Sequence, residues 1–341
     1  YSMAVQVDGK VVLAGMSSGN PSDISDFALV RYNTDGSLDT SFDGDGKTVS
    51  SAGCFTEVLS SVAIRSDGKI LAVGYGYDEN HTNGASFLLR YNSDGSLDTS
   101  FSGDGIVNTH FSQSSVTVQA DGKALVAGYG NYGCILARYN DDGALDSSFG
   151  VNGEVAYAGP GISVKSVIVQ TDGKIIVAGN GYSNTGSGYD FSLARFNSDG
   201  SLDTSFDGDG AVTTAVSPFT DAVSSVTVQA DGKILVAGGY SSNATNTESD
   251  FAIVRYNPDG SLDNTFGMSP TLRNRTVYEG SAVRFAIPAF SFADVDAGDS
   301  LVLSAALSDG SALPAWLSFD AATRTFRGTP TESDVGTRSV R

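Results

Sequence analysis

The sequence predicts an all-β protein, in which a β-propeller of at least five four-stranded blades is followed by a partial β-sandwich. Three observations lead to this prediction. A motif ending in Asp-Gly-Lys recurs five times, each copy supplies short strands and turn signals, and the pattern changes after residue 267. Solenoid coils are usually shorter than these repeats, whereas a four-stranded propeller blade fits both their length and their strand count.

The first two strands of each repeat are joined by a tight turn. The motif Ser-x-x-x-x-x-Asp-Gly-Lys starts at positions 59, 54, 51 and 59 residues apart: Ser2, Ser61, Ser115, Ser166 and Ser225. Asp-Gly is a hairpin signal, because Gly tolerates positive φ at no steric cost. The second strand is apolar on both faces and is expected to end in Gly, as in ILVAG at 234–238. Such a strand suits a sheet that is packed on both sides.

The third and fourth strands complete the unit. The third strand ends in Arg, an aromatic residue and Asn, and the fourth follows a turn that is Gly-Asp-Gly in three copies. The first three strands occur five times but the fourth only four times, because the last copy runs into a different pattern after residue 267. Tyr1 enters directly into a strand pattern, so further domains of the same polypeptide are expected at both ends.

The charge distribution supports two domains, 1–267 and 268–341. Of the formal charge of −19, −18 belongs to residues 1–267 and −1 to residues 268–341. A negative field repels phosphate backbones, so nucleic acid is not an expected partner. No apolar run approaches the length needed to cross a bilayer, so membrane insertion of this segment is not expected either.

Ten of the twenty basic residues occupy two repeat positions. Five lysines follow the hairpin: Lys10, Lys69, Lys123, Lys174 and Lys233. Five arginines end the third strand, each eight residues before an Asp: Arg31–Asp39, Arg90–Asp98, Arg138–Asp146, Arg195–Asp203 and Arg255–Asp263. A catalytic centre is a single constellation, whereas a pair repeated in every blade indicates architecture. We interpret each pair as a structural clamp, because the planar guanidinium binds a carboxylate through two donors.

Two turns near the clamp resemble calcium loops in part. Asn33 and Asp35 occupy ligand positions of such a loop, but Arg31 stands at the first position, where a cation would oppose calcium. An Asx turn therefore explains this segment better. The turn at 43–46, Asp-Gly-Asp-Gly, remains open as either a turn or a weak calcium site.

The segment after the second strand is the most variable part of the repeat. It is expected to form a loop that carries tyrosines among Gly, Asn, Ser and Asp: Tyr75, Tyr77, Tyr129, Tyr132, Tyr182, Tyr189 and Tyr240. Aromatic rings with adaptable polar neighbours are typical of surfaces that bind a sugar or a protein. The alternative is that these rings cover the edges of the blades.

The repeated pattern V-x-x-D-G-K-I-L-V-A-G…D-F-A-L-x-R-Y-N-x-D-G-S-L-D-x-S-F resembles the bacterial delta-sixty β-propeller repeat over residues 1–267. This family is mostly of unknown function and occurs in large secreted or surface proteins. The resemblance therefore implies a propeller fold and a secreted or cell-surface location, and it implies no particular activity.

In the tail, residues 268–341, strands are expected at 276–280, 282–288, 301–307, 313–320 and 323–330, and the string LPAWLSFD is followed by FRGTP. Through this string the tail resembles the dystroglycan-type cadherin-like, immunoglobulin-like domain. By this resemblance we expect the domain to be incomplete at its C-terminal side. In that family the acidic segment is associated with calcium, which implies Asp294, Asp296 and Asp299 as ligands and Glu279 as a further one. Clustered carboxylates suit a hard cation, although a solvated acidic turn remains the alternative.

The sequence contains no recognisable catalytic constellation. His81 and His110 are isolated from any nucleophile motif, and no phosphate loop occurs, so no organic cofactor is expected. Cys54 and Cys134 lack the spacing of zinc ligands, and a disulfide between them stays open.

We therefore predict no enzymatic activity. The expected function is that of a binding or scaffold module in a large exported or cell-surface bacterial protein, related to adhesion. Its propeller loops would contact a glycan or a protein on a surface, and calcium would stiffen its cadherin-like stalk. One alternative is a lectin that uses the tyrosine loops. The second is a propeller glycoside hydrolase, because paired carboxylates are abundant in the sequence.

Overall fold

The computed structural model describes residues 1–18, 25–80, 84–130, 133–159, 161–182, 188–241, 249–263, 266, 277–286, 304–334, 336 and 340. The chain divides into two compact units, Tyr1–Leu262 and Asp263–Arg341. In the described part, all regular structure is β-strand except for one 3₁₀ turn at Glu332–Asp334, which confirms the all-β prediction. None of the described segments forms a helix long and apolar enough to span a bilayer.

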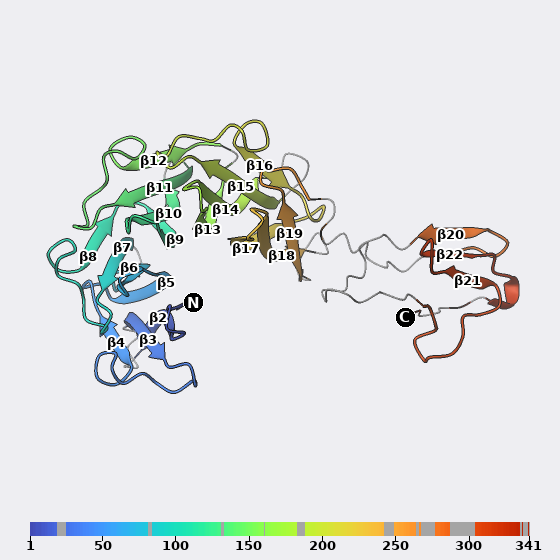
Figure 1. Ribbon diagram of the computed structural model, residues 1–341, viewed down its shortest axis with the longest axis horizontal. Coiled ribbons are helices and arrows are strands. Elements are labelled where there is room, and N and C mark those ends of the chain that lie inside the picture. The colour runs from blue at the N-terminus through green and yellow to red at the C-terminus, as the bar shows by residue number, and fades with distance from the viewer. Residues whose placement is uncertain are drawn as a thin grey trace. The chain divides into compact units, whose positions relative to one another are not determined.

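The first unit consists of five antiparallel blades, each built from one repeat (Figure 1). Among the described residues, a single parallel pair, Ser25 with Thr56, joins blades 1 and 2 into one eight-stranded sheet. Blade 1 contains β1 (Ser2–Val5), β2 (Val11–Ser18), β3 (Ser25–Tyr32) and β4 (Lys47–Ser50). Blade 2 contains β5 (Thr56–Ile64), β6 (Ile70–Tyr77), β7 (Gly84–Tyr91) and β8 (Ile106–Thr109). Blade 3 contains β9 (Ser112–Val118), β10 (Ala124–Gly130), β11 (Gly133–Tyr139) and β12 (Glu154–Tyr157). Blade 4 contains β13 (Ser163–Val169), β14 (Ile175–Tyr182), β15 (Tyr189–Phe196) and β16 (Ala211–Thr214).

Blade 5 has three strands in the described part, β17 (Asp221–Val228), β18 (Ile234–Ser241) and β19 (Ser249–Tyr256), as the repeat count predicted. The first strands of successive blades contact one another near the centre of the unit, and the fourth strands lie at its periphery (Figure 1). This is the arrangement of propeller blades, so the propeller prediction is confirmed.

The core lies between adjacent blades. The second strand contributes to two interfaces through alternate residues, because successive side chains of a strand point to opposite faces. In β6, Ile70 and Ala72 pack in the cluster shared with blade 1, whereas Leu71 and Val73 pack in the cluster shared with blade 3. All four side chains are at most 1% exposed. This two-sided packing explains why the second strand of every repeat is apolar throughout.

Each second strand of blades 2–5 continues beyond the glycine at which the sequence predicted its end. Gly74 lies inside β6 and is paired with Phe87 of β7. On its other side the register of β5 shifts between Leu59 and Ser61, and a Cβ at Gly74 would overlap the carbonyl oxygen of Val58. The prediction of a strand end was wrong because the glycine permits close approach of a bulged neighbour, rather than a stop.

The described residues of the second unit form one three-stranded antiparallel sheet in the order β20-β22-β21, which corresponds to three of the predicted strands. The strands are β20 (Val283–Ala286), β21 (Leu317–Asp320) and β22 (Thr325–Gly328). Phe326 is 3% exposed, and its ring lies 5.0 Å from that of Phe285 and 4.6 Å from that of Phe319. This aromatic cluster holds the sheet together.

Two other predicted strands of the tail differ from the structure. In the segment predicted as a strand at 276–280, Glu279 and Gly280 form a turn, in which Gly280 has a φ of 70° and donates its N–H to the Pro330 carbonyl. That prediction was wrong for the described residues, because a positive φ interrupts the extended backbone. Of the strand predicted at 301–307, the described residues 304–307 contribute one isolated bridge, between Leu307 and Val340.

Both cysteines are free thiols, so the disulfide that the sequence left open is not formed. Cys134 is fully buried in the cluster between blades 3 and 4, and this burial raises its pKa to about 12. It therefore behaves as a small apolar side chain. Burial, reinforced by the charges of Glu57 and Asp78, also raises the pKa of Cys54 above its usual value.

Candidate interaction surface

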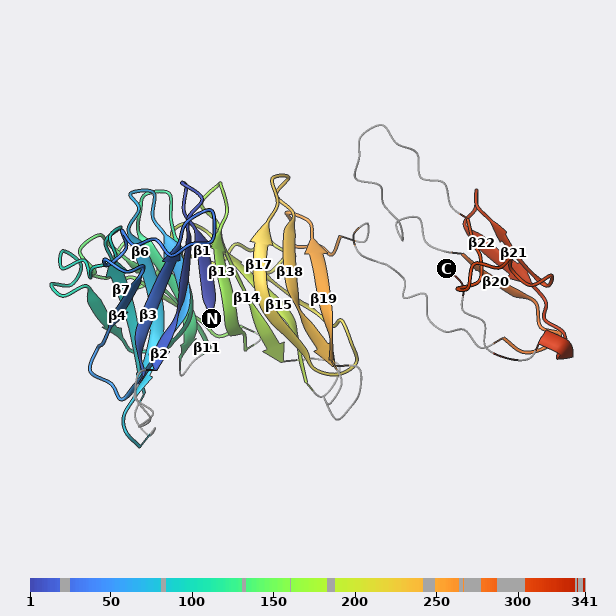
Figure 2. The same ribbon diagram turned by 90° about the horizontal axis from the view of Figure 1, so that it is seen from below.

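The blade topology separates two sets of connections (Figure 2). The hairpin between the first and second strands and the turn between the third and fourth strands lie at one end of each blade, which we call the turn rim. The second strand ends and the third strand begins at the opposite end, where the described members of the predicted tyrosines lie. We call that end the tyrosine rim.

On the turn rim, the structure brings the Arg and Asp of each predicted clamp together in blades 1–4. The distances from Arg Nε to Asp Oδ2 are 2.7 Å for Arg31–Asp39, 2.6 Å for Arg90–Asp98, 2.8 Å for Arg138–Asp146 and 2.7 Å for Arg195–Asp203. These side chains are all less than 10% exposed. In blade 5, Asp263 is 5% exposed and Arg255 Nη1 donates to Gln229 Oε1 at 3.4 Å.

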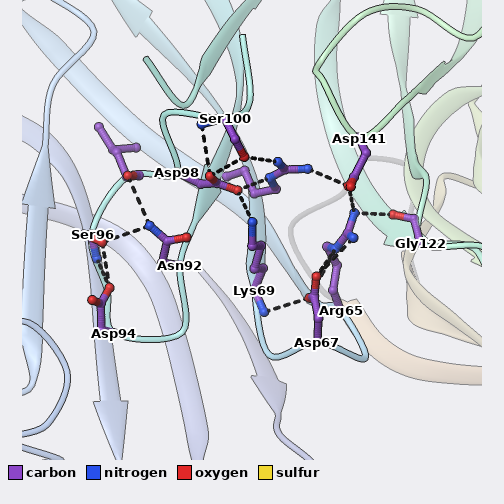
Figure 3. Close-up of polar contacts among 12 residues, drawn as sticks. Arg65, Asp67, Lys69, Asn92, Asp94, Ser96, Asp98, Ser100, Gly122 and Asp141 are labelled. Atoms are coloured by element: carbon purple, nitrogen blue, oxygen red, sulfur yellow. Dashed lines mark hydrogen bonds and ion pairs between the residues drawn. The ribbon is translucent and has the colours of Figure 1, made fainter. Parts of the chain in front are cut away.

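The repeated lysines, whose role the sequence does not reveal, bind the same aspartates. In blades 1–4 the Lys Nζ lies 2.7–2.8 Å from the Asp Oδ2 that also accepts the arginine: Lys10, Lys69, Lys123 and Lys174. Figure 3 shows this arrangement in blade 2, where Lys69, Asp98 and Ser100 converge. Each clamp is therefore a carboxylate held by two cations. The fixed repeat position of Lys was the only signal for this contact in the sequence.

In blades 1–4 the clamp arginine also reaches the next blade. Arg31 Nη1 donates to the Ser93 carbonyl at 2.5 Å, and Arg138 Nη1 donates to the Ser198 carbonyl at 2.7 Å. Arg195 makes the same contact with the Pro258 carbonyl. In blade 2, Arg90 instead binds the Asp141 carboxylate of blade 3 at 2.9 Å, a group that Arg65 also binds at 2.7 Å (Figure 3).

An aromatic ring lies beneath each of these guanidinium groups. The Arg Cζ is 4.6 Å from the centroid of a buried phenylalanine that follows the clamp aspartate by three residues: Phe42, Phe101, Phe149 and Phe206. A cation over an aromatic face is attracted by the ring quadrupole. In blades 1–4 the clamp therefore joins the third strand, the following turn, the phenylalanine ring and the neighbouring blade.

The clamp aspartates have pKa values well below the usual range of a carboxyl. For Asp39 the main cause is the hydrogen bond from Lys10, and the hydroxyl of Ser41 adds to it. For Asp98, Asp146 and Asp203, burial alone would raise the pKa, but the bonds from lysine and serine outweigh it. Hydrogen bonds and cations that favour the charged form keep these groups ionised.

We expect the propeller to lose stability as the pH falls below about 4. The clamp aspartates have a lower pKa in the folded than in the unfolded state. Their contribution is therefore fully present above the unfolded pKa and is lost as the pH falls through that value toward the folded one. Urea denaturation of the full chain at a series of pH values measures this. Asp203→Asn should make the free energy of unfolding fall less steeply as the pH drops below about 4. A free energy of unfolding that already falls near neutral pH would contradict the assignment.

The turns that resemble calcium loops use their carboxylates to close the turn. Asp35 Oδ1 accepts the backbone N–H of Ser37 at 2.9 Å and its hydroxyl at 2.6 Å, which is the Asx turn expected from the sequence. In the turn at 43–46, Asp45 Oδ1 accepts the backbone N–H of Lys47 at 2.9 Å. Within the described ranges, no cluster of three or more His, Cys, Asp or Glu side chains could hold a metal.

The predicted ligands of the tail are mostly outside that part of the chain. Asp294, Asp296 and Asp299 lie outside the described residues, and Glu279 is exposed on its turn. Of these four predicted ligands, the structure therefore describes only Glu279, whose carboxylate is open to solvent. Carboxylate oxygens are the donors that calcium prefers, so the donor chemistry of the set fits that ion.

Six of the seven predicted tyrosines are described, and they lie on strands rather than in loops. Tyr75 and Tyr77 belong to β6, Tyr129 to β10, Tyr182 to the end of β14, Tyr189 to the start of β15 and Tyr240 to β18, whereas Tyr132 lies outside the described residues. The loop placement was wrong because the second strands continue past their glycines and because the third strand of blade 4 already begins at Tyr189.

The tyrosine rim presents ring pairs to solvent. In blade 4, Tyr182 and Tyr189 are 62% and 38% exposed, and their ring centroids are 5.2 Å apart. The hydrogen bond with Tyr182 is the main cause that raises the pKa of Tyr189, and the charge of Tyr129 in blade 3 adds to it. In blade 2, Tyr77 is 37% exposed and lies edge-on to Tyr75 at 5.6 Å. Neighbouring blades thus contribute aromatic side chains to one rim.

Two protein-family models match this sequence. The model described as domain of unknown function (DUF5122) beta-propeller matches residues 6–42, 65–101, 119–149, 170–206 and 229–266, more than half of the chain. The chain belongs to this family. Each segment of the DUF5122 propeller starts before the hairpin turn and ends at the phenylalanine after the clamp aspartate. The model of the He_PIG Ig domain matches residues 265–341, so both predicted resemblances, to a propeller repeat and to an Ig-like tail, are confirmed.

Several solved structures are similar to this DUF5122 chain at low identity. A protein of unknown function from Bacteroides caccae is 14% identical, with 76% of this chain and 78% of that chain covered and a TM-score of 0.45. An exo-beta-1,3-galactanase from Phanerochaete chrysosporium is 8% identical, with 84% and 70% covered and a TM-score of 0.44. An aldose sugar dehydrogenase from Streptomyces coelicolor is 12% identical, with 79% and 91% covered and a TM-score of 0.41. No curated protein matches the sequence.

Proposed function

We propose that this DUF5122 propeller is a non-enzymatic binding module of an exported or cell-surface bacterial protein, with the tyrosine rim as its contact surface. The contrast between the two rims supports this proposal. On the turn rim, the repeated Arg, Lys and Asp side chains of blades 1–4 form ion pairs with one another in the clamps. On the opposite rim, Tyr129, Tyr182 and Tyr189 are 49%, 62% and 38% exposed. Exposed rings with a polar tip suit recognition of a partner at an adhesive surface.

The same contrast disfavours a glycoside hydrolase. Such an enzyme needs one carboxyl group that stays protonated near neutral pH and donates its proton to the leaving group. The repeated aspartates of the clamps have depressed pKa values and are bound by lysine and arginine, so they are unsuited to donate a proton. We expect no turnover of a panel of chromogenic glycosides, and turnover above the buffer blank would contradict the non-enzymatic proposal.

The tyrosine pair of blade 4 favours a carbohydrate as the bound partner. Two rings 5.2 Å apart and inclined by 38° offer apolar faces to sugar C–H groups, and their hydroxyls offer hydrogen bonds. We expect that Tyr182→Ala combined with Tyr189→Ala weakens binding on a glycan array at least about tenfold. The control is Val151→Ala, which changes a residue 77% exposed on the turn rim. Glycan binding that survives the double tyrosine change would contradict the role of this rim.

We also propose that calcium stiffens the Ig-like tail through Asp294, Asp296, Asp299 and Glu279. A cation that binds only the folded tail raises its stability by mass action. The single tryptophan of the chain, Trp316, lies in the tail, so its fluorescence reports the unfolding of that unit. Calcium should raise the midpoint of this fluorescence transition in the full chain, more than that of the propeller transition followed by circular dichroism.

The triple variant Asp294→Asn, Asp296→Asn, Asp299→Asn is the control for this expectation. It should abolish the calcium-dependent shift of the Trp316 signal and leave the propeller transition in place. If calcium instead stabilises the propeller, the turns at 43–46 and their equivalents are the binding sites, and the tail assignment is wrong.

A further inference from the structure

A cavity of about 580 Å³ lies between blades 1 and 2 on the turn rim. The hairpin of blade 1 lines it with Gln6 and Asp8, and the hairpin of blade 2 lines it with Gly68. Ser93, in the turn between the third and fourth strands of blade 2, and the clamp arginine Arg31 also line it. These residues occupy fixed positions of the repeat, so the same place can be compared in the next interface.

Between blades 2 and 3, a guanidinium group of the chain itself fills this place (Figure 3). Arg65 stands at the repeat position of Gln6, two residues before the hairpin aspartate. Its Nη1 donates to the Gly122 carbonyl at 2.6 Å and to Asp141 Oδ1 at 2.7 Å, and its Nη2 donates to Asp67 Oδ2 at 3.1 Å. These partners correspond to residues that line the cavity: Gly122 to Gly68, Asp141 to Ser93 and Asp67 to Asp8. A guanidinium group is therefore the right size and shape for this place.

Gln6 leaves a hydrogen-bond acceptor unused at the cavity. Its Oε1 is buried and has no hydrogen-bond partner among the described residues. In blade 3 the equivalent oxygen, of Gln119, accepts from Arg138 Nη1 at 3.5 Å. Buried polar groups are nearly always hydrogen-bonded, and the last torsion of a glutamine is soft enough to turn its oxygen toward a donor. A ligand that carries N–H donors would therefore supply the missing bond.

The charges around the cavity favour a cation. The basic side chains that line it are each held by a carboxylate of the clamps or hairpins: Lys10, Arg31 and Arg65. Asp8 and Asp94 bring two further carboxylates to the wall. The formal charge of −18 over residues 1–267 adds a field that attracts positive groups.

We propose that this cavity binds the guanidinium group of an arginine side chain from a partner protein. The bound group lies as Arg65 does in the next interface. It donates to the Gly68 carbonyl, the Gln6 amide oxygen and the Ser93 hydroxyl, and its charge is balanced by Asp8. The planar guanidinium suits such a set, because its donors point in fixed directions. The site is on the turn rim, so it is separate from the tyrosine rim.

Titration of the full chain with N-acetyl-arginine amide tests this proposal. Isothermal calorimetry measures the affinity, and the NMR signals of the Gln6 side-chain amide report whether the ligand binds at the cavity. We expect saturable binding that shifts these signals. N-acetyl-citrulline amide has the same length but a neutral urea group, and it should bind at least about tenfold more weakly.

Two variants should change the affinity in opposite directions. Ser93→Asp supplies the carboxylate that Asp141 supplies in the next interface, so it should strengthen binding at least about tenfold. Gln6→Arg places a guanidinium of the chain in the cavity, as Arg65 does, and should abolish binding. The control is Val151→Asp, which adds the same charge as Ser93→Asp at a position of blade 3 that is 77% exposed. It should bind like the wild type.

Several results would overturn the proposal. One is a wild type that shows no saturable binding, and another is equal affinity for the arginine and citrulline derivatives, because the charge is then not recognised. An affinity that Ser93→Asp does not raise, or that a folded Gln6→Arg variant retains, would mean that the ligand binds elsewhere on the acidic surface. Circular dichroism checks the fold of each variant, and if Gln6→Arg does not fold, Ser93→Asp and the citrulline comparison decide.

Discussion

Arg195→Ala should lower the free energy of unfolding of the propeller by about 2–4 kcal/mol. The side chain of Arg195 is 6% exposed, and its guanidinium lies 2.7 Å from Asp203 and stacks on Phe206. Its removal leaves the carboxylate of Asp203 with one cation, Lys174, and takes a donor from the Pro258 carbonyl of the next blade. Urea denaturation of the full chain, followed by circular dichroism, measures the loss.

Two variants separate the parts of this effect. Arg195→Lys keeps the positive charge but loses the planar fork, so it should fall between wild type and Arg195→Ala. Ser205→Ala removes only the 3.3 Å contact with Arg195 and the hydrogen bonds of that hydroxyl to Asp203, and it should cost about 1 kcal/mol. If Arg195→Ala melts within error of wild type, the clamp does not stabilise the blade interface.

The sequence was sufficient to predict the blades and the Arg–Asp clamp, because both depend on local spacing that never varies. Arg and Asp are always eight residues apart, at the end of a strand and in the following turn. The contact with lysine was not predictable in the same way. Lys123 lies 23 residues from Asp146, whereas Lys69 lies 29 residues from Asp98, since the segment between them varies in length. Only the paired strands bring these residues together.

The contacts between blades were not predictable from the sequence either. Arg31 reaches the carbonyl of Ser93, 62 residues away, and a carbonyl group carries no residue-specific signal. The tyrosines were assigned to loops because the glycine was interpreted as the end of the second strand. The bulge in the first strand, which explains that glycine, has no signature of its own among residues such as Leu59 and Ser61.

Gly238→Ala should destabilise the propeller by about 3 kcal/mol or more. Gly238 lies in β18 beside the bulge of β17, where the register shifts between Val223 and Ser225. A Cβ there would overlap the carbonyl oxygen of Ala222 and lie 2.8 Å from the ring of Phe191 in blade 4. Backbone cannot yield as a flexible side chain does, so the strands must separate or the bulge must change. The same glycine position occurs as Gly74, Gly128 and Gly179, each against a backbone carbonyl.

The adjacent residue supplies a matched control. Gly239 is in the same strand, and a Cβ there would meet only the Asp250 carbonyl oxygen, at 3.2 Å. Gly239→Ala should therefore stay within about 1 kcal/mol of wild type, because a small adjustment offsets the contact and alanine loses less backbone entropy on folding. Thermal unfolding of the two variants side by side measures the difference. Equal stabilities would show that β17 relaxes freely at the bulge, and the steric explanation of the repeated glycine would then be wrong.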